Sequence, residues 1–184
     1  MRKRIFCYCC MMAILACGCE FKSSAGDDKT ATKTKVVTSD DNNALHGAVI
    51  KNDIDLEASG VKLKEAYLVD ARNNILTENI TRIGEKIYVI IKLDTGWVKE
   101  NGKSFIGASE RISTSAGKVV VNADDIFKDY EVTGVDMEDA KFISLSAVIK
   151  QADPGLDEFV VKFRVWDKKG SGEIRGKYNF KIKD

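Results

Sequence analysis

The chain has 184 residues, of which 31% are charged and 44% are hydrophobic, the composition of a globular domain with short additional segments. It carries 29 basic and 28 acidic side chains, so it lacks the strong positive charge typical of nucleic-acid-binding proteins, and we predict no nucleic-acid partner. After residue 19, no stretch approaches the roughly 18 apolar residues that a membrane-spanning helix needs.

The first nineteen residues have the pattern of a secretory signal. Three cationic side chains follow Met1, and twelve uncharged residues, IFCYCCMMAILA, come next. A helix of that length spans roughly 18 Å, well short of the ~30 Å hydrocarbon core of a bilayer. A basic start followed by a short apolar run predicts a signal peptide rather than a transmembrane anchor.

Small residues stand directly before two cysteines, in ILAC and in ACGC. With the basic start and the apolar run, this segment resembles the signal peptide and lipobox of bacterial lipoproteins. The resemblance implies cleavage before one cysteine, a diacylglyceryl group on its thiol and an acyl chain, such as palmitate, on the new amine. Because Ile14 occupies the third position upstream, we predict Cys17 as the lipidated residue, with Cys19 as the alternative. Two or more acyl chains are enough for stable anchoring in a membrane.

Two other roles for the cysteines fit less well. The stretch CYCC lacks the Cys-x2-Cys spacing of a metal site and lies within the apolar run. A disulfide framework would spread cysteines through the folded domain, but residues 20–184 contain none. We therefore predict no metal and no cofactor.

Three segments follow from this pattern. Residues 1–16 are the predicted signal peptide, residues 17–48 the lipidated cysteine and a polar tether, and residues 49–184 the folded domain. The tether is rich in Lys, Thr, Ser, Asp and Asn and shows no amphipathic period, as flexible linkers do. About 25 such residues reach roughly 25–30 Å. The single histidine, His46, lies at the end of the tether, where we expect a solvated side chain.

The remaining residues predict an all-β fold. FVVKFRVWD alternates apolar and polar residues, and so does EIRGKYNFKIKD after a glycine-containing loop, which is the signature of a half-buried hairpin. Further strands are predicted at 61–69, 86–93 and 141–149, the last two central because they are apolar on both faces. Turn signals every ten residues or so predict seven to nine strands in an antiparallel β-sandwich of Ig-like architecture.

One short helix is predicted in NADDIFKDY, with Asn122 as its N-cap and Asp124 and Asp125 in its first turn. Tight turns are predicted at Asn101, in the pair Asn-Gly, in SAGK before the run of three valines, and at Pro154.

Candidate catalytic and metal sites are weak. LDTGW contains Asp94 in the Asp-Thr-Gly triplet of aspartic proteases, but that chemistry needs two carboxylates and the triplet occurs once. Acidic stretches at 39–43, 51–55, 122–129 and 134–140 do not match the EF-hand calcium loop, so solvated turns explain them best. We predict that the protein is not an enzyme.

Charge is unevenly distributed along the chain. Residues 159–184 carry eight basic and three acidic side chains, whereas 20–158 carry 18 basic and 25 acidic ones. The strand alternation points six cations outward, on a face for an anionic partner or one balanced by an acidic neighbouring strand. These cations are Lys162, Arg164, Arg175, Lys177, Lys181 and Lys183. Trp166 shares this outward parity and could be an interface or sugar-stacking residue, whereas Trp97 follows a turn; we expect both tryptophans to cover the sandwich ends.

These features predict a lipid-anchored protein of the bacterial cell envelope, at the outer membrane rather than the inner one. Its partners would be the membrane, through the N-terminal lipid, and an envelope protein or glycan. The leading hypothesis is a β-sandwich binding or scaffolding module. Two alternatives remain, an accessory lipoprotein subunit of an envelope secretion or transport machine, and a hydrolase that uses Asp94.

Overall fold

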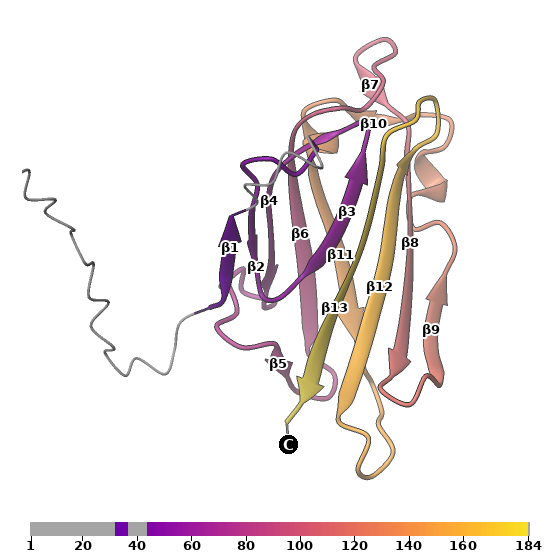
Figure 1. Ribbon diagram of the computed structural model, residues 1–184. Helices are drawn as coiled ribbons and strands as arrows, with labels where there is room; N and C mark the ends of the chain where they lie inside the picture. The colour runs from indigo at the N-terminus through magenta and orange to yellow at the C-terminus, as the bar shows by residue number, and fades with distance from the viewer. Residues whose placement is uncertain (1–31, 37–43, 184) are drawn as a thin grey trace, which may run out of the picture.

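The computed structural model describes residues 32–36 and 44–183, most of which form two large β-sheets packed face to face (Figure 1). The predicted signal peptide, both candidate lipidated cysteines and the acidic stretch 39–43 lie outside the described residues. Within the described ranges, no helix combines the length and hydropathy needed to cross a membrane.

Sheet A has the strand order β1-β2-β4-β6-β11. Its strands are β1 (Thr34–Val36), β2 (Val49–Lys51), β4 (Lys62–Val69), β6 (Lys86–Thr95) and β11 (Phe142–Val148). Sheet B has the order β3-β13-β12-β8-β9, with β5 also paired to β13. Its strands are β3 (Asp55–Ser59), β5 (Ile80–Thr81), β8 (Ile106–Thr114), β9 (Val119–Ala123), β12 (Glu158–Asp167) and β13 (Glu173–Ile182).

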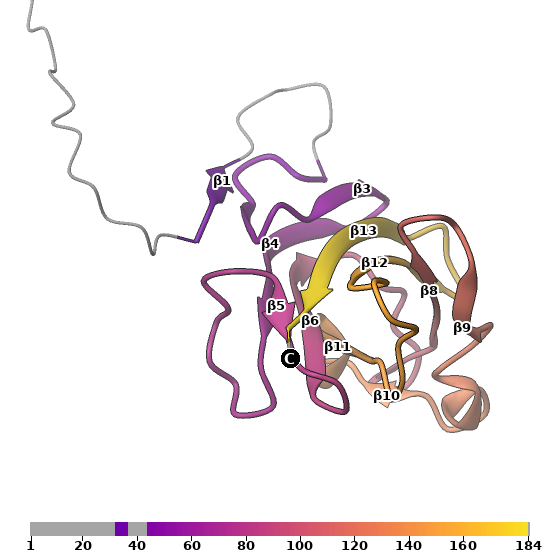
Figure 2. The same ribbon diagram turned by 90° about the horizontal axis from the view of Figure 1, so that it is seen from below.

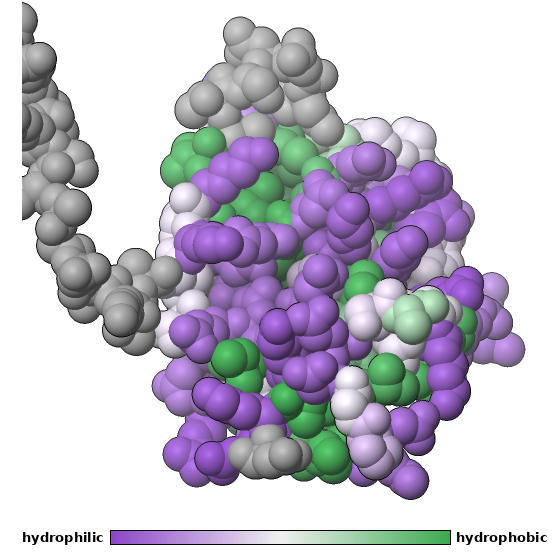
Figure 3. All heavy atoms as spheres, turned by 60° about the horizontal axis from the view of Figure 1, so that its bottom comes forward, coloured by the Kyte–Doolittle hydropathy of each residue, from purple (hydrophilic) through white to green (hydrophobic). Residues whose placement is uncertain are grey.

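Two short strands and two single-turn helices complete the fold. Strand β7 (Lys103–Ser104) pairs with β10 (Val135–Asp136), and the 3₁₀ helices are η1 (Lys128–Tyr130) and η2 (Asp139–Lys141). Seen from the end in Figure 2, the strands of sheet B curve over those of sheet A. From a third direction, the surface is mostly hydrophilic, with hydrophobic side chains in several separate groups (Figure 3).

The predicted alternation in the last two strands is confirmed. In β12 and β13 one face is buried between the sheets and the other is exposed. The inward side chains are Phe159, Val161, Phe163 and Val165 from β12 and Ile174, Tyr178, Phe180 and Ile182 from β13. The Phe159 and Phe180 rings stack with centroids 5.5 Å apart. Burial of such rings supplies much of the hydrophobic stabilisation of a core.

The predicted all-β sandwich is therefore confirmed, with differences in detail. The described residues form thirteen strands, several only two or three residues long, rather than seven to nine. Most pairs are antiparallel, but β2–β4 and β5–β13 are parallel. Strand β1 lies within the predicted tether, and Leu45 and Ala48 are buried in the core, so the folded part begins before residue 49.

The predicted helix in NADDIFKDY is wrong. Asn122 belongs to strand β9, and only η1 is helical in this stretch. Between them, the Asp125 carboxylate accepts hydrogen bonds from the backbone amides of Ala108 and Phe127, and the amide of Ile126 donates to the Ala108 carbonyl. These bonds tie the segment to β8. Aspartate commonly competes with a helix in this way, by bonding to nearby backbone groups.

The predicted central position of 141–149 is also wrong, because β11 is the edge strand of sheet A. Its outward residues Phe142, Ser144 and Ser146 are exposed, so the strand is buried on one face only. The prediction for 86–93 is confirmed, since β6 lies between β4 and β11. The predicted Asn-Gly turn is also present, with Asn101 and Gly102 at φ values of 51° and 77°, as a type I′ turn requires.

Asp167, at the end of β12, joins two loops at one end of the sandwich. It is buried, and its two carboxylate oxygens accept hydrogen bonds from the amides of Val98, at 2.6 Å, and Lys169, at 2.8 Å. We expect Asp167→Ala to lower the free energy of unfolding by about 2 kcal/mol, because two amides lose a charged acceptor. Chemical denaturation measures this, with Asp153→Ala, at an exposed ion-paired aspartate, as the control. Equal losses in both variants would contradict this role.

Candidate functional site

The outer face of sheet B carries a row of cations that crosses three strands. In the strand register, Arg111 of β8 lies opposite Lys162 of β12, which lies opposite Lys177 of β13. The fourth place in this row belongs to Asp55 of β3, whose carboxylate lies 3.2 Å from the Lys177 ammonium. Arg111 and Lys162 form no ion pair with any described residue. Like charges directly opposite each other are destabilising, so this cation row, Arg111, Lys162 and Lys177, is a feature that folding alone does not favour.

A second row, two residues along the strands, is balanced. Arg164 lies opposite Arg175, and Glu57 of β3 lies opposite Arg175. Both arginines bond to the carboxylate of Glu173, with 2.5 Å between Arg164 and Glu173. The hydrogen bond from Arg164, joined by that from Arg175, lowers the pKa of Glu173 against the opposing effect of its burial.

The structure places the six predicted cations as follows. Four form ion pairs, since Arg164 and Arg175 share Glu173, Lys177 pairs with Asp55 and Lys181 pairs with Glu158. Lys183 follows the end of β13 and lies away from the cation row. Of the two alternatives, balance by an acidic neighbouring strand applies at β3, where Asp55 pairs with Lys177, but this balance does not extend to Lys162.

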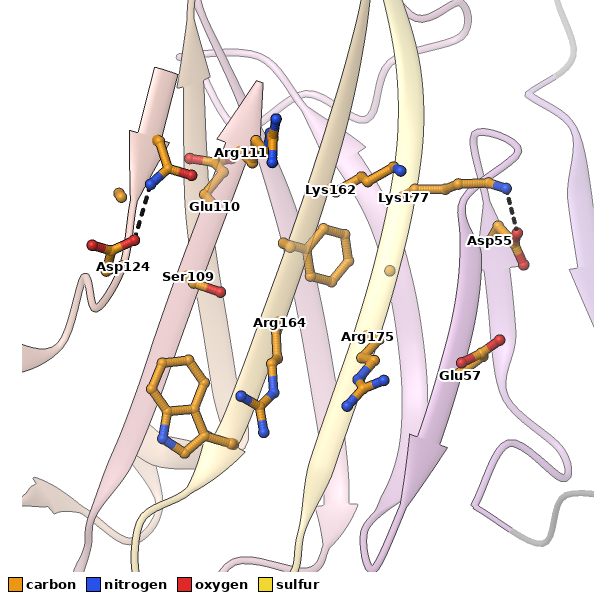
Figure 4. Close-up of a pocket in the computed structure, with 15 residues that line it drawn as sticks. Asp55, Glu57, Ser109, Glu110, Arg111, Asp124, Lys162, Arg164, Arg175 and Lys177 are labelled. Carbon is orange, nitrogen blue, oxygen red and sulfur yellow. Dashed lines mark hydrogen bonds and ion pairs between the residues drawn. The ribbon is translucent and has the colours of Figure 1, made fainter. Parts of the chain in front are cut away.

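The side chains of both rows line an open groove of about 640 Å³ on the outer face of sheet B. We call this hollow the charged groove. Figure 4 shows Arg111, Lys162 and Lys177 side by side across it, with Ser109, Arg164 and Arg175 in the next row. Its further lining residues are Asp55, Glu57, Glu110, Asn122, Ala123, Asp124, Phe163, Trp166 and Gly176.

Trp166 lies on the outer face, as its parity predicted, and is half-buried. A side chain at Gly107, its neighbour in β8, would meet the indole at 2.3 Å, so the ring rests directly on the glycine backbone. The Arg164 guanidinium lies 5.0 Å from the ring centroid. Trp97 is different, because it is buried and its indole N–H donates to the Ala140 carbonyl at 2.8 Å. The expectation that Trp97 closes an end of the core is confirmed.

A second hollow of about 650 Å³ shares Lys177 with the charged groove. Side-chain amides are prominent in its lining, so we call it the amide hollow. Asn79 bridges its walls, because its side-chain amide donates to the carbonyls of Asn52, at 2.8 Å, and Asn179, at 2.9 Å. The lining also includes Lys33, Asp53, Thr77, Glu78, Ile80, Ser115, Glu158, Phe159, Val160, Tyr178, Phe180 and Lys181.

Glu110 is the unusual ionisable group near the groove. It is 5% exposed, and its alternation with buried Ala108 and Ile112 turns it toward the core. One of its carboxylate oxygens and the hydroxyl of Tyr178 are buried without a hydrogen-bond partner. Burial raises the pKa of Glu110 to about 7. Burial, together with the nearby charge of Glu110, also raises the pKa of Tyr178 above its usual value.

The candidate hydrolytic and metal sites gain no support from the geometry. The Asp94 carboxylate is more than half exposed and lies 3.7 Å from the Lys62 ammonium, beside a hollow of only about 70 Å³. The lining of that hollow contains no second acidic residue to share a proton with Asp94. Among the described residues, no group of three or more His, Cys, Asp or Glu side chains could hold a metal ion.

Sequence reasoning missed Arg111 and Ser109 because it did not predict strand β8. The alternation in IGASERIST is interrupted by Glu110 at an inward position, where an apolar residue would have marked a strand. Arg111 follows Glu110 directly and shares the outward parity of Ser109. A strand pattern that allows one charged residue at an inward position would have predicted β8 and placed Ser109 and Arg111 on its outer face.

Comparisons with known proteins identify no function for this chain. No protein-family model matches it, and no curated protein matches it in sequence. Among solved structures, the chain is similar to the crystal structure of the C-terminal domain of wzt, with a TM-score of 0.45 and 9% sequence identity. That alignment covers 72% of this chain and 79% of the other.

Proposed function

We propose that this chain is a lipid-anchored binding protein of the bacterial cell envelope, and that its β-sandwich binds an anionic ligand in the charged groove. One observation carries the proposal, the cation row in an open groove. Arg111 and Lys162 face each other across two strands, and no described residue forms an ion pair with either. Unpaired cations side by side cost stability in the free protein, and an anionic ligand between them would relieve that cost.

The lipid anchor is proposed from the sequence pattern of the first nineteen residues. We expect cells that express the chain with an alkyne analogue of palmitate to label it, and the label to be lost in Cys17→Ser. In Cys19→Ser the label should persist. Loss of label in Cys19→Ser alone would place the lipid on Cys19, and an unlabelled wild type that retains Met1 would refute the anchor. Mass spectrometry of the mature N-terminus reads all three outcomes.

Binding in the charged groove is tested by photocrosslinking in the native host. A photoreactive amino acid replaces Ser109, which lines the groove (Figure 4). The matched control places the same group at Ser144, which is exposed on the outer face of sheet A. We expect a discrete adduct from position 109 and none from position 144. Equal adducts at both positions, or an adduct at 144 alone, would contradict the proposal.

An accessory role in an envelope machine remains the second candidate, and the same experiment separates it. A stoichiometric protein crosslinked at Ser109 supports that role, whereas a carbohydrate adduct supports a glycan-binding module. Charge reversal in the charged groove is best made at Lys162. Reversing Arg164 or Arg175 would break the bonds to Glu173 as well, whereas reversing Lys162 breaks no ion pair among the described residues.

A further inference from the structure

We infer that the ligand of the charged groove is a linear acidic polysaccharide that lies along β12 and β13, an inference that rests on the function proposed above. Four features of the outer face of sheet B point to this class. They are a mixture of hydrogen-bond donors and acceptors, two neighbouring cations without ion-pair partners among the described residues, an indole ring that packs against a glycine, and a second hollow next to the first.

The groove offers both donors and acceptors to a ligand. Guanidinium and ammonium groups of the two rows only donate hydrogen bonds, whereas the carboxylates of Asp55, Glu57 and Asp124 only accept them. Asn122 and Ser109 can do both. A sugar hydroxyl also donates and accepts, so a ligand rich in hydroxyl groups could use both kinds of partner. Such a mixed lining is better suited to carbohydrate than to a ligand that only accepts hydrogen bonds.

The cation row adds a requirement for negative charge. Lys162 occupies its centre, between Arg111 and Lys177, and of these three only Lys177 has an ion-pair partner among the described residues. A guanidinium binds a carboxylate through two parallel hydrogen bonds, and a neighbouring ammonium adds a charge-assisted third. One carboxylate of an acidic sugar between Arg111 and Lys162 would therefore satisfy both cations.

Trp166 supplies an aromatic surface in the same groove. Gly107 lies against the indole, and the Arg164 guanidinium lies over the ring, 5.0 Å from its centroid, so the position of the ring is set by its neighbours. A fixed aromatic ring binds an amphipathic partner at a low cost in conformational entropy. The apolar face of a sugar ring is such a partner, and in a stacking subsite about two rows from Lys162 it would take the place of the Arg164 guanidinium over the indole.

The two hollows together favour a polymer over a single sugar. They share Lys177, and outward residues of β12 from Trp166 to Val160 line one or the other. Six residues of strand span about 20 Å, which exceeds the length of a monosaccharide several-fold. In the amide hollow the N–H groups of Asn79 are already bonded to backbone carbonyls, so the side-chain amide of Asn179 is the group that extends the hydrogen-bonding surface beyond the cation row.

Nucleic acid and polyphosphate fit this face less well. The carboxylates of Asp55, Glu57 and Asp124 border the cations, and they would repel a chain with one phosphate at every unit. Single-stranded nucleic acid also needs several aromatic platforms for successive bases. Among the described residues that line the charged groove, the aromatic side chains are Trp166 and Phe163, and Phe163 is buried in the core.

The test uses the full chain, solubilised from membranes in a non-ionic detergent, and titration calorimetry with four probes. Two are acidic oligosaccharide hexamers, one of galacturonate and one that alternates glucuronate with a neutral sugar. The third is maltohexaose, a neutral hexamer of glucose, and the fourth is inorganic polyphosphate of similar length. We expect at least one acidic hexamer to bind with a Kd below about 1 mM, and at least ten-fold more tightly than the neutral hexamer, the polyphosphate and its own disaccharide.

Variants assign the binding to the groove. We expect the double substitution Arg111→Ala and Lys162→Ala to weaken binding of the acidic hexamer, measured as its Kd, at least ten-fold. The control is the double substitution Lys64→Ala and Lys86→Ala, at two exposed lysines of sheet A, which makes the same change in net charge. It should leave the Kd of the acidic hexamer within two-fold of the wild-type value. Trp166→Ala should also weaken binding at least ten-fold, and Trp166→Phe should restore most of it.

Three other results would contradict the polysaccharide inference, and they differ in what they mean for the proposed function. Polyphosphate that binds as tightly as the acidic hexamers, with no effect of Trp166→Ala, would overturn the polysaccharide inference and leave an anion-binding groove standing. If neither acidic hexamer binds while the Ser109 crosslink captures a protein, the inference also fails and the proposed binding surface survives. If no probe binds and Ser109 forms no adduct, both fail together.

Discussion

Replacing Glu110 by glutamine is expected to raise the free energy of unfolding at pH 8 by about 3 kcal/mol. Glu110 is buried at an inward position of β8, and burial raises its pKa from an ordinary value near 4.5 to about 7. Glutamine has nearly the same shape and cannot ionise. The gain measures how much the buried negative charge disfavours the native state.

The effect has a defined pH dependence. The raised pKa means that the native protein holds the Glu110 proton more tightly than the unfolded chain does. Its contribution to stability is complete below about pH 4.5 and is lost as the pH rises through about 7. We therefore expect Glu110→Gln and the wild type to have nearly equal free energies of unfolding at pH 4. Between about pH 4.5 and 7, the two free energies of unfolding should diverge by about 1.4 kcal/mol per pH unit.

Urea denaturation of both proteins at a series of pH values measures this divergence. Glu131→Gln is the matched control, because Glu131 is exposed and forms no ion pair with the described residues. The difference between Glu131→Gln and the wild type should stay small over the whole range. A constant difference for Glu110→Gln at all pH values would contradict a buried carboxylate whose pKa is raised to about 7.

Trp97→Ala is expected to lower the free energy of unfolding by about 3–5 kcal/mol, the usual cost of removing a large buried aromatic side chain. Trp97 is 6% exposed, packs in the core and donates a hydrogen bond from its indole to the Ala140 carbonyl. The substitution leaves a cavity and an unpaired carbonyl. Trp97→Phe keeps much of the apolar contact and should lose less.

Trp166→Ala is the matched control for that measurement, since it removes the same side chain from a half-buried position on the outer face of sheet B. Its loss of stability should be clearly smaller than that of Trp97→Ala. Equal losses would mean that Trp166 is a structural residue rather than a ligand-binding one. Chemical denaturation of both variants at one pH makes the comparison.

The sequence predicts the strands in which apolar and polar residues alternate strictly, and it fails for a strand in which one residue interrupts the alternation. The hairpin of β12 and β13 follows from strict alternation, and the six outward cations follow from the same period. Strand β8 is not predicted, because Glu110 occupies an inward position where an apolar residue is expected. The misplaced helix has a similar cause, since Asp125 bonds to backbone amides of β8 and of its own turn, and no local signal reveals a partner seventeen residues away.

Half of the candidate site could be predicted in the same way. Parity identifies Lys162 and Trp166 as outward residues, but it cannot say which strand lies beside them. Pairing between β8 and β12 brings Arg111 opposite Lys162, and pairing between β13 and β3 brings Asp55 to Lys177. These contacts join residues about 50 and 120 positions apart, and strand order is a property of the whole fold.

The central claim, that a ligand occupies the charged groove, is tested most directly by repeating the Ser109 crosslink in two charge-reversed backgrounds. One carries Arg111→Glu and Lys162→Glu, and the other carries Lys64→Glu and Lys86→Glu on sheet A, with the same change in net charge. The proposal predicts that the adduct disappears in the first background and persists in the second. An adduct of undiminished yield in the first background would contradict it.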